Sequence, residues 1–373
     1  MTEQAQEPSV IYPEEYEFVA SKNSYYSARV RACLQYKRIS YVETPANISA
    51  IRRVIKLTGE RVYPIVVCPD GTVLRDGCDI VEALEQRHPK RPVIPEDPVL
   101  HLVALIIEMM ADEFMIETSI GFRWTEDKTA EWSKRLFSQI STEREKDPEL
   151  RERGFKNGAK VGEMIRTRVL QPEVGGNPEN RPRALHVTRD ILSRLDAHLQ
   201  ETPFLLGDRP SLADLGLINA IYGHLYRDPG EICDFLHWDC ISLSLWIDHM
   251  LTAAGESDRG ELYLTDSLEQ VLAACAEHYP GRAMERVRSA DEHLSEAPPG
   301  TPISIITGPY YTAWRCQRLR EHFLALPEHS IPEAERLLDK AGLLEVCHYQ
   351  PGWRGEKRKG ILVTADNNPP DHL

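Results

Sequence analysis

The chain has 373 residues, and because a domain usually contains about 150 residues, this length predicts two or three domains. Hydrophobic residues make up 42% of the sequence, which is enough apolar material for a sizeable core. The 44 basic and 58 acidic residues give a net charge of −14, which argues against nonspecific binding to nucleic acid or to an anionic membrane.

No segment has the pattern of a membrane span or an export signal. The longest apolar run, Leu102–Ile107, is far shorter than the roughly 20 residues that a membrane helix requires. Residues 1–8 are polar and acidic, without the basic and apolar regions of a signal peptide. The eight cysteines include no CxxC pair and do not form a disulfide framework. We therefore expect a soluble, cytoplasmic protein without metal-binding cysteine pairs.

Proline clusters mark the expected domain boundaries. Residues 89–98 (PKRPVIPEDP) cannot continue a helix or a central strand and indicate an interdomain linker. A second cluster, residues 297–302 (APPGTP), interrupts the last part of the chain. The domains expected from these boundaries and from the resemblance described below are residues 1–92, 98–252 and 253–373.

Strand and helix patterns alternate before the linker. The strands are expected at Tyr16–Ala20, Tyr41–Thr44, Ile65–Cys68 and Thr72–Leu74, and the helices at 27–37, at 47–57 and around Ile80, Val81 and Leu84. Pro69-Asp70-Gly71 predicts the turn of a hairpin. This order favours a four-stranded mixed sheet covered by helices, which is an α/β domain.

The pattern after the linker is helical. Residues 99–110 and 184–200 carry apolar side chains at helical spacing. Another helix is expected to begin at Ser211, because Asp214 follows three residues later and completes a capping box.

The last 120 or so residues predict an α-rich extension. Its helices are expected at Leu268–His278, Thr312–Leu326 and Pro332–Ala341, and short strands at Ile303–Ile306 and Gly360–Val363. Tyr310, Tyr311 and Trp314 lie close to Arg315, Arg318 and Arg320, which is typical either of a lid over a cleft or of a helix packed on the second domain with its arginines in solvent. Residues 353–359 form a basic patch too short to imply binding of nucleic acid.

Four motifs in order give the chain a resemblance to a known family. They are Ser24-Tyr25-Tyr26-Ser27-Ala28-Arg29-Val30-Arg31, Tyr63-Pro64, Asp76-Gly77-Cys78-Asp79-Ile80 and residues 204–214 (FLLGDRPSLAD). Together they resemble the glutathione transferase superfamily, and the long C-terminal extension is similar to that of a bacterial transferase-like group. The resemblance implies a thioredoxin-like domain over residues 16–88 and an all-helical domain over residues 98–250. It also implies a cytoplasmic homodimer.

The resemblance further implies that glutathione is the cosubstrate and that its thiol is activated beside the first helix. A hydroxyl at the positive end of a helix favours the thiolate, which is the reactive form. Ser24 occupies the position of that hydroxyl in serine-type members, whereas an ordinary N-cap is the alternative role. Tyr25 or Tyr26 could supply a phenol instead, or pack between the domains.

By the same resemblance, four residues are expected to hold the peptide of glutathione. Pro64 corresponds to the family's cis proline, and Tyr63 would pair with the cysteinyl backbone through its own N–H and C=O. Asp76 would meet the γ-glutamyl ammonium, or else serve as a plain N-cap. Gly77 stands where the family has a serine, so it offers an amide but no hydroxyl to the γ-glutamyl carboxylate.

The start of the second domain is expected to face this site. A pocket for a small hydrophobic electrophile would include Met109, Met110, Phe114, Arg123 and Trp124, although methionine and aromatic residues at this spacing also form cores. The acidic pair Asp112-Glu113 is typical of a solvated helix face, although one of the two could instead act as a base if half-buried. Residues 233–240 carry two cysteines, a histidine and an aspartate without a distant second ligand pair, so no metal is expected.

Three functions remain open at this point. The first is a glutathione-dependent transferase, isomerase or reductive-cleavage enzyme acting on a small hydrophobic electrophile. The second is a non-catalytic binding or scaffolding protein, which the glycine at position 77 and the extension favour. The third is an enzyme on this fold that does not use glutathione. Motifs of serine hydrolases, dinucleotide enzymes, P-loop NTPases and zinc proteases are absent from the sequence.

Overall fold

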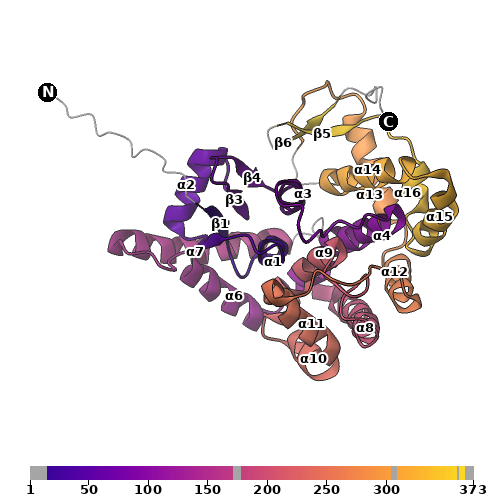
Figure 1. The fold of residues 1–373 in the computed structure, drawn as a ribbon. Helices are drawn as coiled ribbons and strands as arrows, with labels where there is room; N and C mark the ends of the chain where they lie inside the picture. The colour runs from indigo at the N-terminus through magenta and orange to yellow at the C-terminus, as the bar shows by residue number, and fades with distance from the viewer. Residues whose placement is uncertain (1–14, 171–177, 304–308, 359–360, 366–373) are drawn as a thin grey trace.

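The computed structural model describes residues 15–170, 178–303, 309–358 and 361–365. Figure 1 shows the sheet with α1–α3 on one side of the molecule, helices below and beside it, and the C-terminal extension next to α3 and α4. Within the described residues, no helix combines the length and the apolar character needed to cross a membrane.

The N-terminal part is a mixed four-stranded sheet with helices on both faces. Its elements are β1 (Tyr16–Ala20), α1 (Ser27–Tyr36), β2 (Tyr41–Pro45), α2 (Ile48–Thr58), β3 (Ile65–Val67), β4 (Val73–Arg75) and α3 (Gly77–Arg87). The strand order is β2-β1-β3-β4, in which β1 and β2 are parallel and the other neighbours antiparallel. This is the thioredoxin-like α/β arrangement expected from the sequence.

Alternation along the strands assigns the helices to the two faces. Phe18 and Val66 belong to the apolar cluster that contains Ile80 of α3, whereas Val19 and Ile65 pack with residues of α2. Successive side chains of a strand point to opposite faces, so each strand contributes to both layers.

The second part is all-helical. It consists of α4 (Pro98–Met109), the π-helical η1 (Met110–Phe114), α5 (Met115–Thr125), α6 (Asp127–Ile140), α7 (Pro148–Val169), the 3₁₀ turn η3 (Pro178–Asn180), α8 (Arg181–Leu199), α9 (Leu212–Ala220), the π-helical η4 (Ile221–Tyr226), α10 (Glu231–Asp239), α11 (Ile241–Leu251) and the 3₁₀ turn η5 (Ala253–Gly255). The capping box of Ser211 and Asp214 is confirmed at the start of α9. Helices α6 and α7 pack closely at Gly158, where a Cβ would lie 2.5 Å from the Phe137 carbonyl oxygen.

The extension is helical apart from one small hairpin. It contains α12 (Asp266–His278), α13 (Arg282–Leu294), α14 (Tyr310–Leu324), the 3₁₀ turn η6 (Glu328–Ser330), α15 (Ile331–Lys340), α16 (Leu344–His348), β5 (Gly355–Arg358) and β6 (Ile361–Thr364). The last predicted strand is confirmed as β6, and its antiparallel partner β5 was not predicted. Of the strand predicted at Ile303–Ile306, Ile303 lies outside any strand and residues 304–306 lie outside the described residues.

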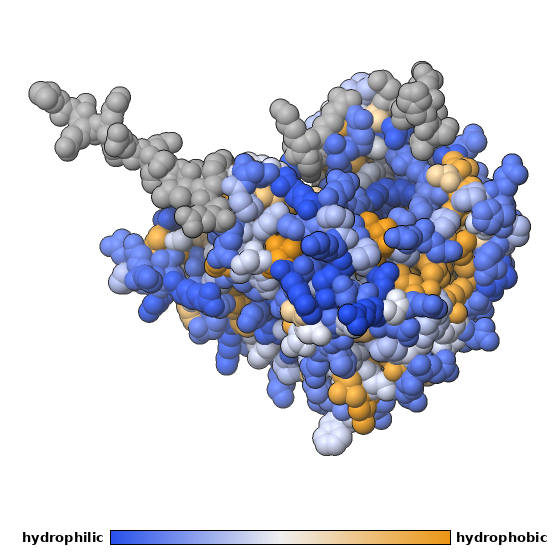
Figure 2. All heavy atoms as spheres, in the orientation of Figure 1, coloured by the Kyte–Doolittle hydropathy of each residue, from blue (hydrophilic) through white to orange (hydrophobic). Residues whose placement is uncertain are grey.

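One apolar cluster runs through all three parts. Phe18 of β1, Leu102 of α4, Trp314 of α14 and Leu337 of α15 are all members of it. The extension therefore shares the core of the two domains that precede it. Figure 2 shows a mostly hydrophilic face with several apolar areas, one of them at the end where α10 and α11 lie. Trp238 of α10 and Ile241 and Leu245 of α11 are exposed.

Candidate functional site

The turn before α1 carries the three residues predicted to activate a thiol. Ser24 is half-buried, and its Oγ accepts a hydrogen bond from the Tyr26 backbone N–H at 3.3 Å. The hydroxyl therefore lies beside the N-terminus of α1, where the partial positive charge of a helix favours an anion.

The two tyrosines differ in their surroundings. Tyr25 is 4% exposed, and its hydroxyl donates to the Ala111 carbonyl at 2.5 Å. Burial raises the pKa of this phenol well above its usual range. Tyr26 is 38% exposed, and its ring lies edge-on to that of Tyr25. The packing role considered for one tyrosine therefore fits Tyr25, whereas Tyr26 lies at the surface.

The Tyr63-Pro64 peptide bond is cis, as expected from the sequence motif. It directly precedes β3, the strand that pairs with β1. Pro64 is buried and Tyr63 is half-buried. Pairing of the Tyr63 backbone with a peptide ligand stays a prediction.

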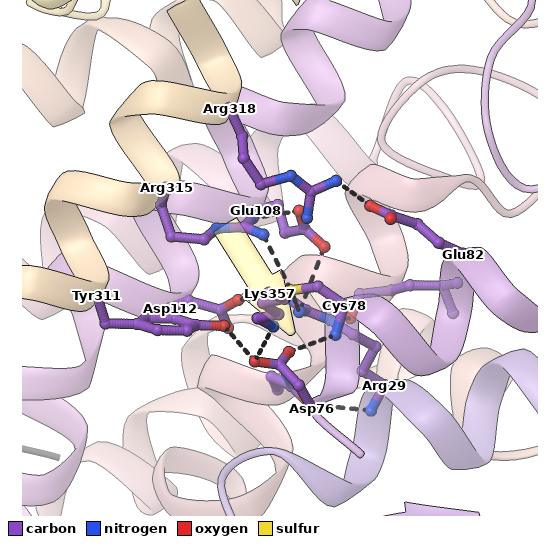
Figure 3. Close-up of polar contacts among 12 residues, drawn as sticks. Arg29, Asp76, Cys78, Glu82, Glu108, Asp112, Tyr311, Arg315, Arg318 and Lys357 are labelled. Carbon is purple, nitrogen blue, oxygen red and sulfur yellow. Dashed lines mark hydrogen bonds and ion pairs between the residues drawn. The ribbon is translucent and has the colours of Figure 1, made fainter. Parts of the chain in front are cut away.

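Asp76 caps α3, which confirms its role as an N-cap, and it has further partners in the extension. Its Oδ1 accepts from the Cys78 backbone N–H at 3.0 Å, while its Oδ2 accepts from the Tyr311 hydroxyl at 2.9 Å and from Lys357 Nζ at 2.8 Å. Figure 3 shows these contacts converging on Asp76 from α14 and β5. Burial opposes ionisation, but Lys357 and Tyr311 lower the pKa of Asp76 overall.

Gly77 begins α3 and lies over the Arg29 side chain. A Cβ at this position would lie 3.6 Å from Arg29 Cδ, which is ordinary van der Waals contact. The space therefore admits a side chain, and the missing hydroxyl is a property of the sequence rather than of the packing.

A fully buried charged cluster lies behind Asp76 (Figure 3). We call it the buried charge cluster, and its members are Arg29, Cys78, Glu108, Asp112 and Arg315. Arg29 pairs with Glu108 at 3.3 Å and with Asp112 at 2.8 Å, and Arg315 pairs with Glu108. Two guanidinium groups thus balance two carboxylates, and the cluster joins α1, α3, α4, η1 and α14.

The same cluster determines two ionisation states. Burial opposes the ionisation of Glu108, but Arg315 and Arg29 lower its pKa to about 2. Arg29 Nη1 and Arg315 Nη1 donate to Cys78 Sγ at 2.8 and 3.0 Å, but burial raises the pKa of this thiol well above its usual range. Cys78 is also only 3% exposed, so its sulfur is not accessible to a substrate.

The structure groups potential metal ligands at positions other than residues 233–240, which the sequence analysis examined for a metal site. In the described part of the chain, Cys78, Glu108 and Asp112 form one such group, and Asp190, Glu277 and His278 form another. The guanidinium groups of Arg29 and Arg315 already neutralise the carboxylates of the first group. Cys233, His237, Asp239 and Cys240 do not form such a group.

The five residues expected to line an electrophile pocket lie in the interior. Met109, Met110, Phe114, Arg123 and Trp124 are all at most 2% exposed. Arg123 forms a bidentate pair with Asp228 and donates to the carbonyls of Asn23 and Gly223, so it holds the loop before α1 in place. The structure supports the packing interpretation of these side chains, and a role toward a substrate stays a prediction.

Glu113 is the acidic residue of this region that remains half-buried. Its carboxylate accepts a hydrogen bond of 2.5 Å from the Thr312 hydroxyl of α14. Burial, more than any neighbouring charge, raises the pKa of Glu113 to about 7. The group can therefore hold or release a proton near neutral pH, as a general base requires.

Glu113→Gln is expected to remove a pH dependence of stability. Because its folded pKa of about 7 is above its ordinary value of 4.5, the stabilisation is complete below about pH 4.5 and is lost as the pH rises through about 7. The free energy of unfolding of the wild type should therefore fall, relative to that of the variant, between about pH 4.5 and about pH 7 and level off above that range. Urea titrations at several pH values measure this difference, and parallel curves would contradict the prediction.

A separate cavity of about 700 Å³ lies at the other end of α1. It is lined by Lys37, Arg38, Lys90, Arg91 and residues 255–259. Lys37 and Arg91 are already paired with Glu85 and with backbone carbonyls. This cavity lies away from Ser24 and Asp76, and the sequence analysis did not identify it.

Glu108 and Lys357 were not assigned to the site from the sequence, whereas Arg315 was considered there only as part of a lid over the cleft or of a helix packed on the second domain. Tyr311, Arg315 and Arg318 are four and three residues apart, so this spacing could have placed them on one helix face. Arg318 also pairs with Glu82 of α3.

Comparison with known proteins identifies the N-terminal domain. Residues 18–92 match the family model of the glutathione S-transferase N-terminal domain. No curated protein matches the chain.

Several solved structures are similar to part of this chain. The β-etherase LigF from Sphingobium sp. strain SYK-6 is 17% identical with a TM-score of 0.46, over 69% of this chain and 98% of that one. Glutathione transferase GSTFuA3 from Phanerochaete chrysosporium is 14% identical with a TM-score of 0.41, over 64% and 97% of the two chains. A theta class enzyme from Xanthomonas axonopodis pv. citri, solved with glutathione bound, is 13% identical with a TM-score of 0.39, over 66% and 100%.

These TM-scores lie below 0.5, so the assignment rests on the family model and on the order of the observed elements. Residues 18–92 thus form a domain of the glutathione S-transferase N-terminal type, which is followed by an all-helical part and a helical C-terminal extension.

Proposed function

We propose that the protein is a glutathione-dependent enzyme that activates a thiol for reaction with a small hydrophobic electrophile. The observation that carries this proposal is the position of Ser24, half-buried at the N-terminus of α1 in a domain that matches the transferase family model. Conjugation, isomerisation and reductive cleavage are the reaction types that such a thiolate supports. We also propose that the protein acts in the cytoplasm as a homodimer.

In this proposal each residue of the site has a distinct task. Glutathione supplies the reacting thiol when bound. The Ser24 hydroxyl donates a hydrogen bond to the sulfur, and the Tyr63 backbone and the Gly77 amide hold the peptide. Asp76 receives the ammonium group of the ligand, and Glu113 is placed to take up a proton close to neutral pH.

The fit of glutathione to this site depends on Asp76. Both of its carboxylate oxygens are already engaged, one by the Cys78 amide and the other by Tyr311 and Lys357. The site therefore fits the cosubstrate only when the Lys357 ammonium leaves Asp76. The same observation favours the second candidate, an enzyme or binding protein on this fold that does not use glutathione.

Ser24→Ala is expected to raise the pKa of the bound thiol by about 1–2 units and to lower turnover about 10–100-fold, because a hydrogen bond to a charged group contributes about 1.5–3 kcal/mol. Thiolate absorbance of the complex across pH and turnover of chlorodinitrobenzene measure the two effects. Ser40→Ala is the control, since Ser40 is exposed and contacts Glu15 outside the site.

Isothermal titration with reduced glutathione tests the proposal as a whole. Binding in the micromolar to millimolar range supports it. If neither the wild type nor a variant with a freed Asp76 binds at about 10 mM, where the binding free energy is only about −2.7 kcal/mol, the function is independent of glutathione. Unchanged turnover in Ser24→Ala would exclude Ser24 as the activating group.

A further inference from the structure

The strand β5 carries a cation into the site that the proposed function assigns to the ligand. Lys357 Nζ lies 2.8 Å from an oxygen of Asp76 and 2.8 Å from an oxygen of Asp79. Its side chain is 13% exposed and lies over the Trp314 ring at 4.2 Å. Lys357 is therefore enclosed between α3 and α14, as Figure 3 shows.

The ammonium of Lys357 is the same chemical group as the amino group of a γ-glutamyl ligand. Asp76 Oδ2 already accepts from Lys357 and Tyr311, and Oδ1 accepts from the backbone at the start of α3. A second ammonium cannot take the position of the first without displacing it. Lys357 and the amino group of a ligand thus compete for one acceptor.

The two parts of the extension that reach Asp76 are held very differently. Helix α14 is fixed by Arg315 in the buried charge cluster and by Trp314 and Phe323 in the apolar core. The strand β5 forms a two-stranded hairpin with β6, and hydrogen bonds between Gly355 and the Gln317 side chain attach it to α14. On the β6 side, backbone hydrogen bonds join Leu362 and Thr364 to residues 300–303, and Leu362 belongs to the apolar core. A two-stranded hairpin is marginally stable alone, so it depends on such attachments.

From these contacts we infer that the β5–β6 hairpin is an intrasteric gate, in which Lys357 occupies the ligand's ammonium site on Asp76 and leaves it when the ligand binds. This inference rests on the proposed function for the identity of the ligand. The closed position of the hairpin depends on the ion pairs of Lys357 with Asp76 and Asp79 and not on the identity of the ligand. With the hairpin displaced, Tyr311 remains beside Asp76, because α14 holds it in place.

The test uses the full chain with Lys357→Met, which keeps the apolar stem and removes the charge. Lys340→Met is the matched control, because Lys340 Nζ of α15 pairs with Glu269 of α12 at 2.6 Å, away from Asp76. Lys357→Arg restores the charge. Hydrogen exchange of the amides in β5 and β6 is measured without ligand, and the affinity for reduced glutathione is measured by isothermal titration.

We expect hairpin amides to exchange at least about tenfold faster in Lys357→Met than in the wild type, Lys340→Met or Lys357→Arg. We expect glutathione to bind Lys357→Met at least about tenfold more tightly than the wild type, which corresponds to about 1.4 kcal/mol. If the amides of β5 and β6 exchange at the same rate in Lys357→Met as in the wild type, the gate is overturned, whether or not glutathione binds. Equal or weaker glutathione binding by Lys357→Met, where the wild type binds, would also overturn it.

The experiment distinguishes failure of the gate from failure of the proposed use of glutathione. If the hairpin amides of Lys357→Met exchange faster but no variant binds glutathione at about 10 mM, the gate stands and glutathione is excluded as its ligand. Should Lys357→Met fold poorly, Asp79→Asn weakens the same attachment from the other side, and faster exchange in that variant supports the gate while unchanged exchange overturns it.

Discussion

Arg315→Met is expected to lower the free energy of unfolding by about 3–5 kcal/mol, because it leaves an uncompensated carboxylate in the interior. Arg315 and its partner Glu108 are each 3% exposed in their side chains, so water cannot replace the lost guanidinium. Urea unfolding followed by circular dichroism measures the loss. Arg288→Met is the control, because its pair with Glu345 is 58% and 63% exposed, and a surface pair contributes at most about 1 kcal/mol.

A second substitution at Glu108 distinguishes the loss of stability caused by the unbalanced charge from the loss caused by altered packing. In the variant that combines Arg315→Met with Glu108→Gln, Arg29 and Asp112 still form a balanced pair. We therefore expect the double variant to be less destabilised than the sum of the two single variants, by about 1–3 kcal/mol. Strict additivity would show that the two residues stabilise the protein independently of their charges.

Asp214→Ala is expected to lower the free energy of unfolding by about 4 kcal/mol or more, since several buried donors would lose their acceptor together. Asp214 accepts from the backbone of Leu205 and Ser211, from the Ser211 hydroxyl and from the Trp246 indole, all at 2.8–2.9 Å. Urea unfolding followed by circular dichroism measures the loss.

A conservative variant and a surface variant serve as controls for Asp214→Ala. Asp214→Asn keeps an acceptor oxygen for Leu205 and Trp246, so it should retain part of the stability. Asp234→Ala removes an exposed aspartate from the first turn of α10 and should cost no more than about 0.5 kcal/mol. A loss below about 1 kcal/mol in Asp214→Ala would contradict the central role of this carboxylate.

Local patterns were enough to predict the elements that surround the site. The four-stranded mixed sheet was expected from the order of strand and helix signals along the chain, and the capping box depends on two residues three positions apart. The N-cap role of Asp76 was likewise indicated by a short motif, and such caps are determined within a few residues, where side-chain type and spacing act directly on the backbone. The cis peptide before β3 was expected only from the resemblance to the transferase family, because most X-Pro bonds are trans.

The partners of Asp76 could not be predicted in the same way. Lys357 lies 281 residues further along the chain, and its basic neighbours are equally typical of a solvated surface segment. Glu108 and Arg315 become partners only because α14 packs on α4. Such long-range pairings depend on tertiary packing, and the sequence shows the charges without showing which of them meet.

The helix α4 has apolar or buried residues on almost all of its circumference. Leu102, Val103, Ala104, Ile106, Ile107 and Glu108 are buried, because α9 covers one side while α14 and α15 cover another. A chain shortened to end after α11 would present that second side to water, including one carboxylate deprived of its arginine. The C-terminal third is therefore an obligatory part of the folding unit, and engineering by truncation would produce an aggregation-prone fragment instead of a minimal enzyme. Any opening of the site in the native protein must be confined to the small hairpin, since the helices behind it cannot leave.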